Sequence, residues 1–203
     1  PSLTLLLKSE ILKIEKKYNA LEKVYEEMSK NQLTENLGLR GMMEQYLRAE
    51  DYHHAYVYGE KLFNNNPYIE KIYETLINII AKTSNWTQLI QISDRAYTKK
   101  IINRDIYYIN KSIAFYEIAK VKKSGDIKDS LNNILKALKL RKNFPPYVIL
   151  YIEMLIEEKK YNLAKKYLKK TWSENPHSEY KEIIIKLAEY LNIGVYTLAN
   201  FIT

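Results

Sequence analysis

The chain has 203 residues, of which 46% are hydrophobic, and this length corresponds to one or two domains. It contains no cysteine, which excludes disulfides, thiolate metal sites and cysteine nucleophiles. The net charge of +8 suits an acidic protein, a nucleic acid or an anionic membrane surface, but lysine, isoleucine, asparagine and tyrosine are abundant together, so we interpret much of the charge as compositional.

A short phrase recurs along the chain at a nearly constant interval. It has a polar or turn pair, a bulky apolar residue, two mostly polar residues, and a small or apolar residue. The intervals between successive bulky residues are 34, 34, 41, 34 and 34. A period of about 34 residues is typical of the tetratricopeptide repeat (TPR), a helix–turn–helix unit that stacks into a solenoid. The bulky positions are Tyr18, Tyr52, Trp86, Ile127, Tyr161 and Val195.

The period predicts an all-α fold, a single TPR-like, right-handed solenoid of about five and a half helical hairpins. The phrase marks the start of the second helix of each hairpin. The predicted units are residues 2–35, 36–68, 69–102, 103–144, 145–176 and a shortened last unit, 177–203.

The first two units carry local signals for how their helices begin and approach one another. Thr34 precedes an apolar helical pattern and is a predicted helix N-cap. Gly38 and Gly41 lie three apart on one helix face, which predicts a close backbone approach. The small Ala55 lets the two helices of its hairpin pack closely.

The fourth unit holds the one irregular interval, which is seven residues longer than the others. Seven residues are nearly two helical turns, so a helix can absorb them without rotating its apolar face. The apolar spacing through Ile106, Ile109 and Ile113 predicts one long first helix over residues 104–123. A second helix is predicted from Ile127 to about residue 142.

The last unit is expected to leave apolar surface uncovered, because a solenoid that stops short exposes its final interface. Leu198, Phe201 and Ile202 are the residues concerned, and we predict a homodimer through this end. Since the sequence begins without an initiator methionine, we also expect it to be a piece of a longer protein.

No catalytic, cofactor or metal site is predicted, and we do not expect an enzyme. The three histidines do not occur at metal-ligand spacing with carboxylates, and there is no glycine-rich phosphate loop. Nucleic acid is not an expected partner, because the aromatic residues fall at core positions of the repeat. A stripe of basic residues is a candidate contact for anionic headgroups or an acidic protein, or simply a solvated helix face: Lys165, Lys166, Lys169 and Lys170.

The candidate protein-binding site is the concave groove, which the first helix of each TPR hairpin lines. Its residues are a mixture of charged and apolar types, which argues against a lysine and asparagine clamp for a carboxylate and favours a peptide or helix held by apolar contacts. The candidate groove residues are Leu37, Arg40, Glu44, Leu47, Lys71, Glu74, Asn78, Ile149, Glu153 and Ile156.

Four segments, in this order, resemble the HemY-type TPR proteins that are tied to haem biosynthesis in proteobacteria. They are Pro1-Ser2-Leu3-Thr4-Leu5-Leu6-Leu7, the pair Tyr25-Glu26-Glu27-Met28 and Leu37-Gly38-Leu39-Arg40-Gly41, and Asn175-Pro176-His177-Ser178-Glu179. The resemblance implies two membrane-spanning helices upstream of this sequence, a bacterial inner-membrane location and a TPR part on the cytoplasmic side. It also implies a non-catalytic scaffold for late enzymes of protohaem synthesis.

Two alternatives to this scaffold stay open at the level of the sequence. The domain itself could bind haem or a porphyrin, which would require a large apolar cleft with an inward-facing histidine or tyrosine. Alternatively, the chain is a TPR adaptor unrelated to haem, since TPR consensus positions match many families.

Overall fold

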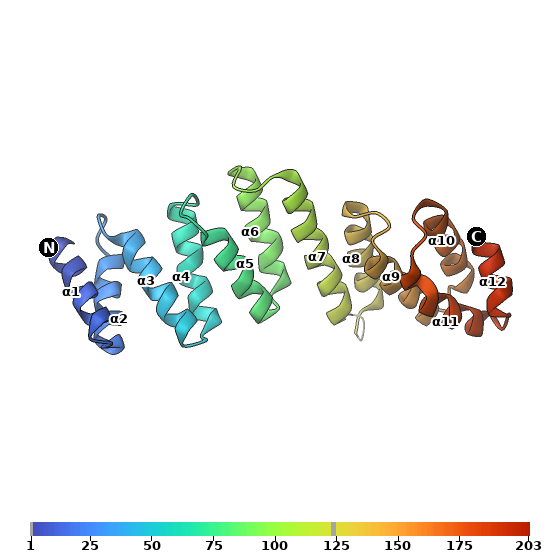
Figure 1. Cartoon of the computed structure of the whole chain (residues 1–203), viewed down its shortest axis with the longest axis horizontal. Helices are drawn as coiled ribbons and strands as arrows, with labels where there is room; N and C mark the ends of the chain where they lie inside the picture. The colour runs from blue at the N-terminus through green and yellow to red at the C-terminus, as the bar shows by residue number, and fades with distance from the viewer. Residues whose placement is uncertain (1, 123–124) are drawn as a thin grey trace. The chain divides into compact units, whose positions relative to one another are not determined.

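The computed structural model describes residues 2–122 and 125–203, and all regular secondary structure there is helical (Figure 1). This confirms the predicted all-α, TPR-like fold. The chain separates into two compact units, Pro1–Ile102 and Asn103–Thr203. Because each unit is defined by its own internal contacts, a single continuous solenoid stays a prediction.

The first unit consists of three helical hairpins in which each helix packs against the next along the chain. Its helices are α1 (Ser2–Ile14), α2 (Tyr18–Ser29), α3 (Glu35–Arg48), α4 (Tyr52–Asn65), α5 (Ile72–Thr83) and α6 (Trp86–Thr98).

The second unit also consists of three hairpins, with a short 3₁₀ turn before the last one. Its helices are α7 (Arg104–Lys122), α8 (Ile127–Leu140), α9 (Pro145–Glu157), α10 (Tyr161–Glu174), η1 (Ser178–Tyr180), α11 (Lys181–Leu191) and α12 (Val195–Ile202).

The recurring phrase begins the second helix of every hairpin, as predicted. All six bulky positions are the first residue of α2, α4, α6, α8, α10 or α12. The residue just before the bulky one is the N-cap, and in Asp51, Asn85 and Asp126 its side chain accepts a hydrogen bond from a backbone N–H of the first turn. In several copies of the phrase, the residue before the N-cap has a left-handed backbone, which ends the first helix of the hairpin. Its φ is 57° at Glu50 and 53° at Ser84.

Gly38 and Gly41 place α3 directly against α2, which confirms the predicted close approach. A Cβ on Gly38 would lie 2.4 Å from the backbone nitrogen of Ser29, and a Cβ on Gly41 would lie 2.5 Å from Cζ of Tyr25. Thr34 is the N-cap residue of α3, as predicted, but its side chain forms no capping hydrogen bond with that helix. Its buried hydroxyl donates to the carbonyl of Met28, at 2.9 Å, and so satisfies the end of α2 instead.

α7 is 19 residues long, against 12 for α5, which confirms the lengthened helix. It starts at Arg104 as predicted, while the predicted end at residue 123 lies outside the described residues. Its buried residues, among them Ser112 and Ala114, lie beyond the first two turns. Ile106 is 42% exposed and Ile109 is 40% exposed, so the expected continuous apolar face does not extend to the start of the helix.

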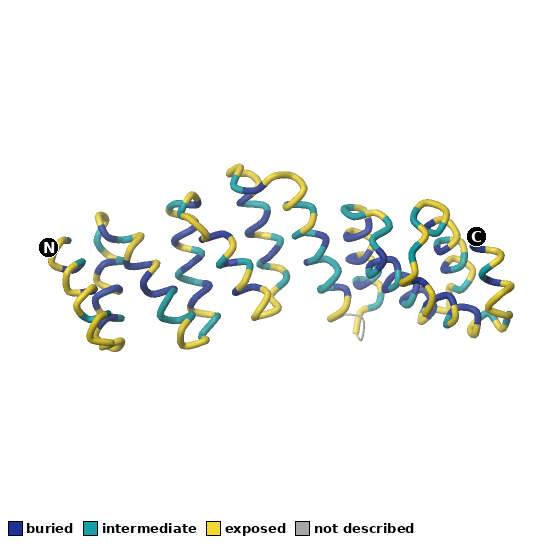
Figure 2. The backbone as a smooth tube through the Cα atoms, in the orientation of Figure 1, coloured by how far each residue is buried: buried dark blue, intermediate teal, exposed yellow. Residues whose placement is uncertain are grey.

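The core of the second unit forms around α9, of whose 13 residues only a few reach solvent (Figure 2). Tyr147 is fully packed there, and its hydroxyl lies 3.1 Å from Oγ of Ser112 on α7. Leu198 and Ile202 of α12 join the same core and are 0% and 1% exposed. The prediction that these two residues lie at an uncovered apolar end is therefore wrong, because α12 already packs against α10 and α11. Phe201, the third residue of that prediction, is 37% exposed.

Candidate functional site

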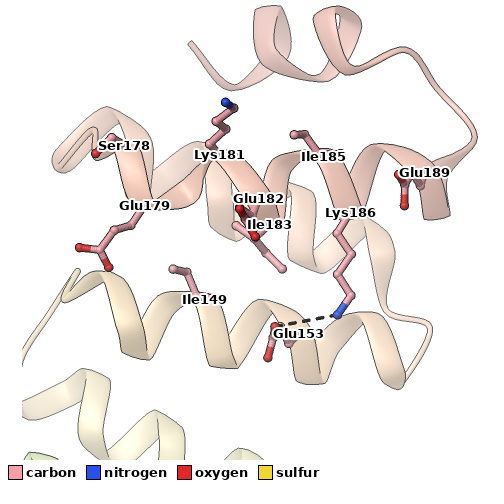
Figure 3. Close-up of a pocket in the computed structure, with 10 residues that line it drawn as sticks. All are labelled: Ile149, Glu153, Ser178, Glu179, Lys181, Glu182, Ile183, Ile185, Lys186 and Glu189. Carbon is pink, nitrogen blue, oxygen red and sulfur yellow. Dashed lines mark ion pairs between the residues drawn. The ribbon is translucent and has the colours of Figure 1, made fainter.

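A hollow of about 1000 Å³ lies between α9 on one side and η1 and α11 on the other (Figure 3). We call it the α9–α11 groove. It belongs wholly to the second unit. The residues that line it are Ile149, Glu153, Ser178, Glu179, Lys181, Glu182, Ile183, Ile185, Lys186 and Glu189.

Helix geometry explains which side chains reach this space. Ile149 and Glu153 are four residues apart and share one face of α9, while nine other residues of that helix are buried in the core. Figure 3 shows both of them directed toward α11, from which Ile183 and Lys186 point back toward α9. Ile183 belongs to the buried core and Ile149 packs against it, so the base of the groove is apolar.

The groove is acidic although the whole chain is basic. It is lined by the carboxylates of Glu153, Glu179, Glu182 and Glu189 but by only two lysines. Nζ of Lys186 lies 3.9 Å from Oε1 of Glu153 and links the two walls (Figure 3).

The remaining carboxylates face solvent. Glu182 and Glu189 are exposed, and neither forms an ion pair with any residue in the described part of the chain. Oε1 of Glu179 lies 3.6 Å from Nδ1 of His177, whose ring nitrogen also accepts a hydrogen bond from the backbone N–H of Glu179.

Four of the candidate groove residues lie around a second hollow, of about 250 Å³, between α3 and the start of α5 in the first unit. Within it, Nε of Arg40 donates to Oε1 of Glu44 at 3.0 Å. Lys71 is the N-cap of α5, with a left-handed φ of 63° and an exposed side chain. The candidates around this hollow are Arg40, Glu44, Leu47 and Lys71.

The structure does not bring the other candidates into either hollow. Leu37, Glu74 and Asn78 are exposed and lie outside the residues that line them. Ile156 is only 3% exposed, so its assignment to an open groove is wrong. It is buried because the core closes around the last turn of α9.

The α11 side of the groove was missed at the level of the sequence. The positions 34 residues after Ile149 and Glu153 are Ile183 and Leu187, and Leu187 is completely buried. The charged groove residues Glu182 and Lys186 stand one position earlier. The repeat period predicts equivalent positions on α9 and α11, and it does not reveal which residues of α11 face α9.

The basic stripe on α10 does not present one uniform surface. Nζ of Lys165 and of Lys169 lie 3.8 Å and 4.3 Å from the ring centroid of Phe201, and Lys169 also donates to the Phe201 carbonyl at 2.6 Å. These two lysines therefore hold α12 against α10. Lys166 and Lys170 are exposed.

A third hollow, of about 380 Å³, lies beside Tyr46 where α2 begins and α3 ends. The Tyr46 hydroxyl donates to Oε1 of Glu22 at 3.0 Å, and its ring stacks on those of His54 and Tyr58. Burial, followed by this hydrogen bond to a carboxylate, raises the pKa of Tyr46 to about 12. The hydroxyl therefore stays protonated at neutral pH and acts as a fixed donor.

The histidines do not form a metal or haem site with neighbouring carboxylates. Nδ1 of His54 is bonded to Oδ2 of its helix cap Asp51, at 2.7 Å. Among the described residues there is no group of three or more histidines and carboxylates that could hold a metal ion.

None of the helices in the described part of the chain has both the length and the apolar character that crossing a bilayer requires.

No protein-family model matches the chain, and no curated protein matches it significantly. Among solved structures, the Naa15/Naa10 complex bound to HypK-THB aligns with 92% of this chain and 28% of its own, at 17% identity and a TM-score of 0.54. MamA 41-end from Desulfovibrio magneticus RS-1 aligns with 85% of this chain and 93% of its own, at 11% identity and a TM-score of 0.40. YrrB, a TPR protein with an unusual peptide-binding site, aligns with 95% and 92%, at 12% identity and a TM-score of 0.40.

These likenesses concern the fold alone, and only the one to the Naa15/Naa10 complex has a TM-score above 0.5. The helix order and the 34-residue period, together with the likeness to the Naa15/Naa10 complex, show an all-α, TPR-like fold.

Proposed function

We propose that the chain is a non-catalytic protein-interaction scaffold that binds a polypeptide segment in the α9–α11 groove. The observation that carries the proposal is the groove itself, an open hollow of about 1000 Å³ with an apolar base and charged walls. Such a combination suits a peptide, since apolar contacts supply affinity while the charges set orientation. YrrB and the Naa15/Naa10–HypK-THB complex, which share the fold, are by their titles a peptide-binding protein and a protein assembly.

Site-specific photocrosslinking tests this proposal. A photoreactive amino acid replaces Glu182 in the groove or, as a matched control, the exposed Lys139 on α8. After irradiation in the native cell extract, mass spectrometry identifies the crosslinked peptides. We expect a defined segment of a partner protein at position 182 and not at position 139. The same partners at both positions, or none at position 182, would contradict the proposal.

The resemblance to HemY-type proteins supports a narrower proposal about the partners and the location. In it, the chain is tethered to the bacterial inner membrane by a preceding segment, with the TPR part on the cytoplasmic side, and it gathers late enzymes of protohaem synthesis. The same crosslinking in isolated membranes tests it. A segment of a late haem enzyme at position 182 is the expected result, whereas partners without any link to haem would favour the adaptor unrelated to haem.

The alternative that the domain binds haem has less support from the geometry. The groove is lined by four glutamates, whose charge would repel the propionates of a porphyrin. The nearest histidine, His177, caps η1 through Nδ1. Spectral titration with haem should therefore show no saturable Soret shift.

A further inference from the structure

We infer that the α9–α11 groove selects a cationic segment, an extended peptide with arginine or lysine at every third position and an apolar residue between them. This inference rests on the proposed function and adds the chemistry of the partner. It depends on how the carboxylates are arranged and on what the two lysines of the groove do.

Three carboxylates follow one side of α11 and the turn before it. Glu179, Glu182 and Glu189 are separated by three and seven residues, intervals that return to nearly the same helix face. All three are exposed. They form an acidic stripe along the open edge of the groove.

The two lysines offset the charge of the groove only in part, because four carboxylates line it. Lys186 is directed to Glu153 on the opposite wall, at 3.9 Å. Figure 3 shows Lys181 pointing away from α9 and from the base of the groove. The stripe thus keeps its negative charge in a chain whose net charge is +8.

The spacing of the carboxylates indicates the form of the ligand. Glu182 and Glu189 are seven residues apart, which is about 10.5 Å along a helix. A peptide in the extended polyproline II conformation rises about 9.3 Å in three residues and returns to the same side at every third residue, whereas the side chains of a β-strand alternate. Basic residues three apart can therefore each meet a carboxylate, while an apolar residue between them faces the apolar base of the groove.

The same charges exclude other partners from this groove. An acidic peptide would place like charges opposite one another, which disfavours binding. The phosphates of a nucleic acid or of an anionic lipid surface would be repelled in the same way. The groove therefore selects a class of protein segment that a basic chain would otherwise repel.

Fluorescence anisotropy with labelled peptides tests this inference on the whole chain. The probe is a twelve-residue peptide with arginine at every third position and leucines between. Two further peptides replace the arginines by glutamate or by serine. We expect saturable binding of the arginine peptide that weakens with added salt, and at least about tenfold weaker binding of the other two.

Two variants locate the binding. The double variant Glu182→Lys with Glu189→Lys should weaken binding of the arginine peptide by about tenfold or more, because two attractions become repulsions. The control is Glu27→Lys with Glu50→Lys, which makes the same change of charge at exposed residues of the first unit. It should change the affinity by no more than about twofold. Circular dichroism verifies that both variants are folded.

Several outcomes would overturn the inference. One is that the arginine peptide does not bind. Another is that the control variant loses as much affinity for this peptide as the Glu182→Lys and Glu189→Lys variant does. A self-association that the Glu182→Lys and Glu189→Lys variant abolishes would assign the groove to a second copy of the chain. Tighter binding of the glutamate or serine peptide, lost on Ile149→Asp, would reject the cationic segment while leaving the proposed peptide-binding function intact.

Discussion

At the scale of single residues, the closest packing is where two glycines let α3 approach α2. A methyl group at Gly38 would meet backbone atoms, with Ser29 N at 2.4 Å and Tyr25 O at 2.6 Å. Backbone atoms cannot move aside without displacing the whole helix. At Gly41 the obstacle is the ring of Tyr25, which is itself only 4% exposed and cannot swing away.

Gly38→Ala should therefore destabilise the protein although alanine is the better helix former. The expected loss is about 1–3 kcal/mol of unfolding free energy, since overpacking outweighs the helix propensity gained, about 1 kcal/mol. Urea denaturation followed by circular dichroism measures it. Gly59→Ala is the matched control inside α4, because its Cβ would meet the side-chain ends of Leu76 and Met43 at 3.0 Å, and these can shift. If the two variants lost the same stability, the backbone contact would not be the cause.

At the scale of the helices, α12 completes the second unit. Leu198 is fully buried, whereas Tyr196 on the same helix is 88% exposed. Leu198→Ala should cost about 2–5 kcal/mol, the range for removing a buried leucine side chain. Tyr196→Ala should change stability by less than about 0.5 kcal/mol. Thermal and urea unfolding compare the two. A neutral Leu198→Ala would indicate that α12 does not belong to the core.

The extra length of α7 leads to a second prediction at this scale. Its first two turns carry no fully buried residue, and Oδ1 of Asn103 caps the helix by accepting from the backbone N–H of Ile106, at 2.9 Å. Deletion of residues 104–110 would bring Ile113 to the position of Ile106 relative to Asn103, so the cap can re-form. The loss should be clearly smaller than that of a deletion in the buried part of the helix, because none of the removed residues is buried.

A deletion of equal length, residues 112–118, is the control for this prediction. It removes the buried Ser112 and Ala114 and should prevent cooperative folding. Urea unfolding measures the stability lost by each of the two deletion variants. A large loss from the 104–110 deletion would show that the exposed turns contribute to packing.

At the scale of the whole molecule, buried tyrosine hydroxyls predict the response to alkaline pH. Burial is the main cause that raises the pKa of Tyr46, Tyr56 and Tyr167 to about 12, from the ordinary tyrosine value of 10.0. The first two belong to the first unit and the third to the second. A raised pKa means that the folded state favours the neutral phenol.

The stability that these tyrosines contribute is therefore complete below pH about 10 and is lost as the pH rises toward 12. We expect the free energy of unfolding to fall by about 1–3 kcal/mol over this interval, after allowing for partial solvent exposure. Urea titrations at each pH, with tyrosinate absorbance recorded in parallel, measure it. The triple variant with phenylalanine at all three positions should lose less over the same interval, and an identical loss would rule these residues out.

The sequence by itself determined the helices, because the signals involved are local. The phrase at Tyr52 or Trp86 contains both the left-handed residue that ends one helix and the cap that begins the next, and the irregular interval predicted the length of α7. Gly38 and Gly41 likewise predicted a close contact, since an unfavourable helix residue needs a packing reason.

Only the tertiary structure decided which faces of those helices are covered. Ile156 and Leu198 were predicted to be accessible and are buried, and the Thr34 hydroxyl bonds to α2 rather than to its own helix. The acidic groove arises from α9 and α11, whose facing residues are about thirty positions apart in the sequence. Whether a side chain is buried, and which charges surround it, depends on how the neighbouring helix is rotated about its axis. The repeat period of a sequence does not specify that rotation.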